Sequence, residues 1–416
     1  MTPVRSLRDA PWLTTGPASR VLALLNADGE EARVVGGAVR NALLGVPVGD
    51  VDIATTALPG DVVRRAGAAH IKSVPTGIAH GTVTLVADGQ PFEVTTLRED
   101  VETFGRKATV VFGRDWVRDA LRRDFTINGL SVDADGTIHD HVGGLDDIEK
   151  RRVRFIGEPS RRIAEDYLRI LRFFRIHAAY GSGEIDRAGY LACIAGRDGL
   201  ASLSAERMRM EMLKLVVADG AAAALVAMED AGLLLAVTGG VAYRGPFLAL
   251  VGIAHELGLK PDPVRRLGAL CVAVSEDAKR LAQRLRLSNA EAKQLDSMGH
   301  RWWRMVDMDD AKSRRLLYRL GPDNYRDRLM LAWARSGSAV APERWRELAT
   351  LCERWAAPKF PLKASDFIAR GVAEGPALGQ ALGLAEDAWL AQNFPLDAAS
   401  LTAIADPIAA RFNGAQ

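Results

Sequence analysis

The sequence predicts an α+β fold: a small domain with a mixed or antiparallel sheet and covering helices, followed by a long all-helical remainder. Up to about residue 140, short stretches of helical periodicity alternate with apolar stretches of strand length. From about residue 145, helical periodicity dominates and Ala, Leu and Arg become abundant. Strands first and helices later is the α+β pattern, and a chain of 416 residues is too long for one ordinary domain.

The elements of the first part follow from periodicity and turn residues. We expect helices at 17–26, 38–44 and 59–69, and strands at 33–35, 51–55, 71–74, 82–87 and 92–97. Pro59 suits a helix start, and Asp88-Gly89 is a hairpin signal. Residues 98–114 are polar, charged and glycine-containing, which predicts a mobile loop, and a short strand pair is expected at 130–132 and 138–139. Glycines at 181–183 and 239–240 are expected to break helices.

Composition excludes several classes of protein. The net charge is only +2, so any basic surface must be local. The three cysteines, Cys193, Cys271 and Cys352, are far apart and predict reduced core thiols in a cytoplasmic protein. We see no signal-peptide pattern at the start of the sequence and no apolar run long enough for a membrane span.

Two short motifs point to nucleotide chemistry. Gly36-Gly37 lies between an apolar strand and a helical stretch, where backbone N–H groups and the helix N-terminus can receive phosphate. Asp50 and Asp52 share one face of the next strand, and paired carboxylates suit Mg²⁺ that bridges to a triphosphate. Either motif alone is more often a simple turn or a solvated loop, but their order and spacing favour a site.

A third carboxylate follows in a strand. Glu93 lies on the strand face opposite Phe92 and Val94, and a carboxylate inside a strand is costly to bury unless it is paired or binds metal. A surface or sheet-edge Glu is the alternative. Beside the two aspartates, Glu93 could accept a proton from an attacking hydroxyl or complete the metal site.

Two later motifs carry arginines. The segment RRDFTIN (122–128) contains Arg123, Asp124 and Asn128, which suit phosphate or ribose contacts, although a charged helix end is also possible. The segment EDYLRILRFFR (165–175) reads as one helix, on which Asp166 and Arg169 share a face.

The Asp166–Arg169 pair predicts a base reader. A carboxylate that accepts and a guanidinium that donates match the amino group and ring nitrogen of cytosine and adenine, and they oppose uracil and guanine. Arg172 and Arg175 continue the stripe with one acid among three arginines, which predicts an anion against them. A solvated charged face is the alternative.

These motifs, in this order, resemble the class II tRNA nucleotidyltransferase and bacterial poly(A) polymerase family, and most closely its CCA-adding enzymes. The resemblance covers about residues 30–215. The matching segments are GGAVRN (36–41), DVD (50–52), EVTTLR (93–98), RRDFTING (122–129), EDYLRILRFFR (165–175) and ERMRMEM (206–212).

The resemblance implies a nucleotidyltransferase head at 1–144, a base-recognising neck at 145–215, a body at 216–278 and a tRNA-binding tail at 279–416. It implies Mg²⁺ on Asp50 and Asp52, CTP and ATP as substrates, and the 3′ end and acceptor arm of a tRNA as partner. Asp50, Asp52 and Glu93 would be catalytic. The nucleotide-binding residues would be Gly36, Gly37, Arg40, Arg123, Asp124, Asn128, Asp166, Arg169, Arg172 and Arg175. The segment 206–211 would brace the neck helices.

One departure lies in the first motif. The family often has Asp where this chain has Asn41, so a salt bridge is lost, but Asn keeps hydrogen-bonding capacity and the change should be tolerated. The polar segment 98–113 has the length expected of enzymes that add the final A, which argues against a CC-only enzyme.

The tail contains a basic stretch. Residues 279–330 hold thirteen Lys and Arg against seven acids, with Trp302-Trp303 among them, which suits phosphate contacts with a folded RNA.

Other functions stay open at this point. A poly(A) polymerase or an A-only adding enzyme would use the same chemistry. A non-catalytic RNA-binding protein would have had no reason to retain Asp50, Asp52, Glu93, Asp166 and Arg169. An Asp-x-Asp glycosyltransferase would leave the base reader and the basic tail without a role.

Overall fold

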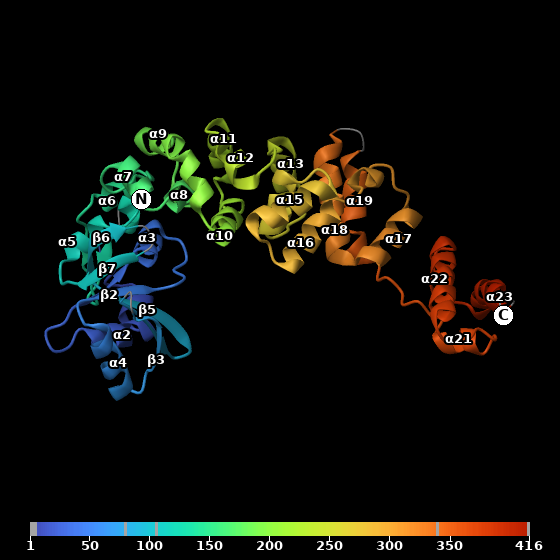
Figure 1. Ribbon diagram of the computed structural model, residues 1–416, viewed down its shortest axis with the longest axis horizontal. Helices are drawn as coiled ribbons and strands as arrows, with labels where there is room; N and C mark the ends of the chain where they lie inside the picture. The colour runs from blue at the N-terminus through green and yellow to red at the C-terminus, as the bar shows by residue number, and fades with distance from the viewer. Residues whose placement is uncertain (1–5, 79–80, 105–106, 338–340, 414–416) are drawn as a thin grey trace. The chain divides into compact units, whose positions relative to one another are not determined.

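The structure is a computed structural model that describes residues 6–78, 81–104, 107–337 and 341–413. By its internal contacts it divides into two compact units, residues 1–242 with 284–286, and residues 243–283 with 287–416 (Figure 1). The first unit contains all the described strands and the second is helical, which confirms the predicted α+β class with strands before helices.

The first unit is built on a seven-stranded mixed sheet in the order β3-β4-β5-β2-β1-β8-β9. The strands are β1 (Ala32–Val35), β2 (Asp52–Thr55), β3 (Lys72–Gly77), β4 (Thr82–Ala87), β5 (Gln90–Thr96), β8 (Ser131–Val132) and β9 (Ile138–His139). Only β2 and β5 run parallel, and the other neighbours are antiparallel. Since β2 and β5 carry Asp52 and Glu93, this parallel pair decides which carboxylates meet.

The expected hairpin between the fourth and fifth strands is confirmed. Ala87 pairs with Gln90, and Asp88 and Gly89 between them have φ of 51° and 78°. Two positive φ angles define the tight turn whose twist matches the strands, and Gly89 adopts one of them without a Cβ clash.

Helices cover this sheet. They are α1 (Pro11–Thr14), α2 (Pro17–Leu25), α3 (Gly37–Leu44), α4 (Pro59–Ala68) and α5 (Trp116–Leu121). The helices α2 and α4 contact each other and both contact β4. The core between them contains Leu22, Val83 and Leu85, which are fully buried. The alternation of buried and half-buried residues along β4 is the period-two pattern from which a strand was expected.

The mobile loop predicted for residues 98–114 is wrong as a description of secondary structure. Residues Arg98–Phe104 (β6) and Lys107–Phe112 (β7) form a separate two-stranded antiparallel hairpin. The charged residues in REDVETF (98–104) hid the first strand, because they do not show a regular apolar alternation. Residues 105–106, within the same prediction, lie outside the described residues.

The rest of the first unit is helical. Its helices are α6 (Gly144–Glu149), α7 (Pro159–Glu165), α8 (Leu168–Tyr180), α9 (Arg187–Ala195), α10 (Ala205–Leu215), α11 (Ala221–Asp230) and α12 (Leu233–Thr238), with 3-10 turns at Thr126–Asn128 and Arg197–Ser202. As expected, α8 ends at Gly181 and α12 ends at Gly239, which has φ of 67°. The helix α8 packs against α10 and α11 and buries Phe173 and Phe174.

The second unit is made of helices. They are α13 (Arg244–Glu256), α14 (Pro263–Cys271), α16 (Asn289–Gly299), α17 (Asp310–Leu320), α18 (Pro322–Ser336), α19 (Pro342–Ala349), α20 (Leu351–Arg354), α21 (Ala364–Ile368), α22 (Pro376–Ala391) and α23 (Ala398–Asn413), with a 3-10 turn at Trp302–Met305. The helix α15 (Ser275–Leu285) contributes residues to both units. One core gathers around Tyr325, Leu329 and Trp345.

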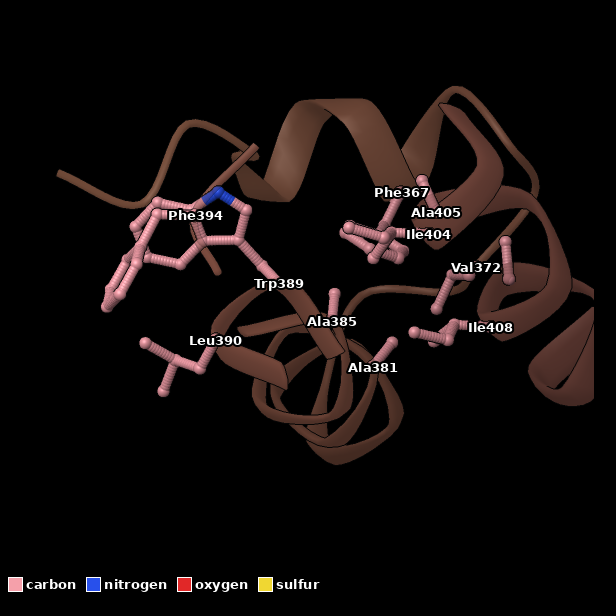
Figure 2. Close-up of a cluster of buried hydrophobic side chains, with 11 residues drawn as sticks. Phe367, Val372, Ala381, Ala385, Trp389, Leu390, Phe394, Ile404, Ala405 and Ile408 are labelled. Atoms are coloured by element: carbon pink, nitrogen blue, oxygen red, sulfur yellow. The ribbon is translucent and has the colours of Figure 1, made fainter. Parts of the chain in front are cut away.

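A second core lies at the end of the chain. Figure 2 shows Trp389 beside Phe394 within a cluster that includes Phe367 and Ile404. The Trp389 and Phe394 rings lie 5.0 Å apart edge to face, and the ring of Tyr318 of α17 also meets Trp389 edge to face, at 5.4 Å. This aromatic contact joins α22 to α17. Within the described residues, no helix is long and apolar enough to cross a bilayer.

Candidate active site

The Gly36-Gly37 turn opens the site. Gly36 has φ of 72° and ψ of −123°, a conformation that other residues adopt at high cost, and its N–H donates to the carbonyl of Leu130. A Cβ on Gly36 would lie 3.3 Å from Arg123 Nη1. Because α3 begins at Gly37, the turn presents a helix N-terminus to the cavity beside it.

That cavity has a volume of about 780 Å³. It brings together the predicted residues Gly36, Gly37, Arg40, Asp50, Asp52, Arg123, Asp124, Asn128, Asp166, Arg169, Arg172 and Arg175. The lining also includes Asn41, Gly49, Arg122, Leu168, Ile176, Tyr180, Arg207 and Lys214. Of the predicted site residues, only Glu93 is not part of this lining.

The acidic end of the site is set by strand register. Asp52 of β2 lies directly beside Glu93 of β5, and Asp50 is two residues upstream on the loop that enters β2. Partial desolvation raises the pKa of Asp52, the negative charges of Glu93 and Asp50 raise it further, and Arg123 opposes them. A cation would relieve this repulsion, so the aspartates fit a metal.

Asp50 and Asp52 do not form a complete metal site by themselves. Over the described ranges, no three His, Cys, Asp or Glu side chains lie close enough together to hold an ion. A cation on Asp50 and Asp52 would therefore take further oxygen ligands from a bound triphosphate or water.

Arg40 is buried and is held by neutral groups. Its Nη1 donates to Asn128 Oδ1 at 2.5 Å, and its Nε and Nη2 donate to Asn41 Oδ1 at 3.1 and 2.8 Å. Its guanidinium lies 3.7 Å from the ring centre of Tyr180. These contacts show that Asn41 keeps a hydrogen-bonding role beside Arg40, and its tolerance in place of an acid stays a prediction. Burial lowers the pKa of Arg40, and the influence of Tyr180 opposes this.

Asp124 is a buried anchor. Its Oδ2 accepts from Arg172 Nε at 2.7 Å, and its Oδ1 accepts from Asn128 Nδ2 at 3.1 Å and from the N–H of Phe125 at 2.9 Å. Burial raises the pKa of this carboxyl, but the charge of Arg172 and the hydrogen bonds outweigh it, so the pKa is lowered. A continuous hydrogen-bonded chain thus runs from Arg40 through Asn128 and Asp124 to α8.

Arg123 is aimed at the cavity by an acid of α5. Its Nε and Nη2 donate to Asp119 Oδ2 at 3.1 and 2.9 Å. Arg162 of α7 donates to the backbone carbonyls of Arg122 and Arg123. The contacts of Arg162 hold the backbone of residues 122–123 against α7.

The expectation of one continuous helix over 165–175 is wrong. The helix α7 ends at Glu165, Asp166 is extended with φ of −157°, and α8 begins at Leu168. Asp166 Oδ1 accepts from the N–H of Leu168, as a capping aspartate does near a helix start. Asp166 and Arg169 still line the same cavity, but through this break and not through helical spacing.

The arginine stripe has acid partners, and two of the three come from outside its own segment. Arg169 donates to Glu165, Arg172 to Asp124, and Arg175 to Glu211. The anion expected against Arg172 and Arg175 is therefore present as carboxylates of the protein itself, and nucleotide binding by these arginines stays a prediction. Glu211 is buried on α10 and also lies 3.8 Å from Arg172, which agrees with a bracing role for segment 206–211.

Eight further residues line the cavity and were not predicted, and four of them have cationic or phenolic side chains. These four are Arg122, Tyr180, Arg207 and Lys214. Arg207 and Lys214 are seven residues apart on α10, so they share one helix face. That spacing is visible in the sequence, but only the packing of α10 on α8 shows that the face meets the site.

The fold and this cavity define a nucleotidyltransferase. Residues 32–154 match the family model of the poly(A) polymerase head domain, and residues 185–239 match a model described as a probable RNA and SrmB-binding site of polymerase A.

Two curated relatives narrow the class. The chain is 31% identical to the mitochondrial CCA tRNA nucleotidyltransferase 1 of Mus musculus, over 90% of this chain and 86% of that protein. It is 42% identical to the CCA-adding enzyme of Geobacillus thermodenitrificans over 58% of this chain and 62% of that one.

Among solved structures, the CCA-adding enzyme of Bacillus stearothermophilus in complex with CTP superposes with a TM-score of 0.72 at 27% identity. The match covers 97% of this chain and 98% of that one. The chain belongs to the family of CCA-adding enzymes.

Proposed function

We propose that this protein is a template-independent nucleotidyltransferase that adds C, C and A to the 3′ end of tRNA from CTP and ATP, with release of pyrophosphate. The observation that carries this proposal is the cavity of about 780 Å³. It joins a glycine turn for phosphates, a pair of aspartates for a cation, and an Asp–Arg pair for a base.

The triphosphate would lie between the Gly36-Gly37 turn and Arg40. Backbone N–H groups at the start of α3 and a buried guanidinium are well suited to phosphate oxygens. Arg123, which is held by Asp119, would contact the ribose or phosphates. Asp124, Asn128, Arg172 and Arg175 would keep this wall of the cavity rigid while facing the nucleotide.

Asp50 and Asp52 would hold the divalent metal that nucleotidyltransferases of this family typically need. We propose that this metal is Mg²⁺, because carboxylate oxygens and phosphates are the ligands that Mg²⁺ prefers. When bound, Mg²⁺ would neutralise phosphate charge and make the attacking hydroxyl more acidic.

In the reaction, the 3′-hydroxyl oxygen of the tRNA bonds to the α-phosphorus, and the bond from that phosphorus to the leaving pyrophosphate breaks. The hydroxyl proton passes to a base. Glu93 lies in register with Asp52 and is the carboxylate that we propose as this base; to act as a third metal ligand instead, it would have to move toward the aspartates. A Glu93→Gln variant separates these roles: loss of a base changes the pH profile of the rate, whereas loss of a ligand raises the Mg²⁺ requirement.

The base would be read by Asp166 and Arg169. The carboxylate accepts from an exocyclic amino group and the guanidinium donates to a ring nitrogen, so C and A fit. Uracil and guanine present the opposite pattern and would leave buried polar groups unpaired.

The remaining chain would bind RNA. We propose a head at 1–144, a neck at 145–215, a body at 216–278 and a tail at 279–416 that receives the tRNA. In the second unit, a cavity of about 550 Å³ is lined by basic residues that include Arg301, Arg304, Arg315 and Arg319, which supports phosphate binding there. Three unpaired cysteines favour a cytoplasmic location.

The test is incubation of the purified protein with Mg²⁺ and a tRNA that lacks CCA, with CTP, ATP or both, and with products read at single-nucleotide resolution. Three additions that stop at CCA support the proposal. Two C's only, a single A on a tRNA that ends in CC, or a long A tail would indicate a CC-adding enzyme, an A-adding enzyme or a poly(A) polymerase. No incorporation would favour a non-catalytic RNA-binding protein.

A further inference from the structure

The carboxylate assigned to base reading is held by a residue from another helix. Asp166 Oδ2 accepts a hydrogen bond of 2.7 Å from Arg207 Nη2, while Oδ1 accepts from the N–H of Leu168 at 3.1 Å. Arg207 comes from α10, forty-one residues further along the chain. It also lines the cavity beside Asp166.

We propose that Arg207 is a positioning residue that sets the base selectivity of this enzyme by acting through Asp166. This inference rests on the proposed function of the cavity. Asp166 is extended and lies between two helices, so its side chain is oriented by only two donors, the N–H that opens α8 and Arg207. With one donor on each oxygen, the carboxylate is fixed in orientation and each oxygen keeps lone pairs for a base.

A fixed acceptor discriminates better than a mobile one. A carboxylate free to turn could rotate away from the carbonyl oxygen of uracil or guanine, and the wrong base would escape most of the repulsion. A carboxylate that is held in place cannot relax in this way, so the wrong base meets the full mismatch. Arg207 should therefore affect the rejection of wrong bases more than the rate with the correct one.

Arg207 is half exposed, and its partner Asp166 is 33% exposed. A purely structural ion pair at such exposure contributes little to stability, so the fold should survive its removal. The Arg169 guanidinium is held separately, by Glu165 Oε2 at 2.6 Å and by the carbonyl of Arg162 at 2.7 Å. The change at Arg207 therefore perturbs one half of the base reader only.

The experiment compares the kcat/KM of the full chain for CTP and UTP, with a tRNA that lacks CCA, in wild type and in Arg207→Gln. We expect the CTP-over-UTP ratio to fall by about tenfold or more, the usual effect of one charge-assisted hydrogen bond. Arg207→Lys keeps the charge and should restore much of the ratio.

Arg209→Gln is the matched control. Arg209 lies on the same helix, is not part of the cavity lining, and donates to the carbonyl of Arg286. This variant should keep the wild-type ratio. A double-mutant cycle with Asp166→Asn tests the route: the ratio of Asp166→Asn should hardly change when Arg207→Gln is added.

Three results would overturn the inference. These are an unchanged ratio in Arg207→Gln, equal effects of Arg207→Gln and Arg209→Gln, or a lower KM for CTP at constant ratio, which would show that Arg207 competes with the base. Wild type that adds neither C nor A would refute the proposed function itself, so the two failures are distinguishable.

Discussion

Asp124→Asn tests the buried anchor between the glycine turn and α8. In the native protein, Oδ2 faces Arg172, and Oδ1 faces two N–H donors, from Asn128 and Phe125. An amide has one acceptor and one donor end, so in either orientation its NH₂ group must face a donor. After the substitution, Arg172 keeps the ion pair with Glu211, at 3.8 Å.

The structure sets bounds on the unfolding free energy that Asp124→Asn should lose. Removing one partner of a buried ion pair costs about 3–5 kcal/mol. Arg172 is 32% exposed and keeps Glu211, so water and the second acid reduce the loss, and we expect about 2 kcal/mol. For a unit of this size that corresponds to a fall in Tm of about 4–8 °C.

The lowered pKa of Asp124 fixes the direction in which its contribution to stability changes with pH. The folded pKa of Asp124 lies below its unfolded value, so the carboxylate contributes stability above the unfolded pKa and loses it as pH falls through the folded pKa. The difference between wild type and Asp124→Asn should be complete near pH 7 and should shrink below about pH 4.

The assays are thermal unfolding between pH 3 and pH 7 and amide hydrogen exchange in α8. Asp146→Asn is the control, since Asp146 is exposed and pairs with Lys150 at the surface, and it should show no measurable change. Equal Tm values for the two variants, or a difference that grows as pH falls, would refute the reasoning.

Three further predictions concern the site and the thiols. Asp52→Ala should lower incorporation by about a thousandfold or more while tRNA retention in a filter assay stays near wild type, because only the cation site is removed; full activity would exclude the metal assignment. Gly36→Ala should lower both stability and activity, with a cost of about 1–2 kcal/mol from positive φ. Gly45 also has positive φ, but a Cβ there would meet open space, so Gly45→Ala should lower the Tm without lowering nucleotide affinity. Equal losses of activity in Gly36→Ala and Gly45→Ala would contradict the argument that the contact of Gly36 with Arg123 matters. Burial raises the pKa of Cys271 to about 12, so in native protein at pH 8 iodoacetamide should label half-buried Cys352 before it labels Cys271. Peptide mass spectrometry measures the two labelling rates, and rapid labelling of Cys271 would contradict its burial.

Much of the fold could be predicted because the signals are local. The Asp88-Gly89 hairpin and the glycine stops after α8 and α12 depend on residues within a few positions of one another. The β6–β7 hairpin was missed because the charged residues of 98–104 do not show a regular apolar alternation. The helix break at Asp166 was missed for a different reason. The residues from 165 to 175 have good helical periodicity, and no glycine or proline marks the interruption.

The membership of the site was more predictable than its internal pairing. Twelve of the thirteen predicted residues line one cavity, because each lies in a short motif with its own chemistry. The acids that neutralise the arginines could not be predicted in this way. Asp124 meets Arg172 across 48 positions and Glu211 meets Arg175 across 36, so only the packing of helices reveals them.

The arginines of the cavity differ in whether their hydrogen-bond partners are charged. Arg123, Arg169, Arg172, Arg175 and Arg207 each contact a carboxylate of the protein. The hydrogen bonds and the ring contact of Arg40 involve only two amides and a phenol. A guanidinium held by neutral acceptors keeps its orientation without having its charge cancelled, and burial strengthens its field. The exchange of the family's acid for Asn41 contributes to this state, because an aspartate at the same place would neutralise Arg40. This buried guanidinium, which is held by neutral groups, thus lies beside the glycine turn, where it is available to a triphosphate.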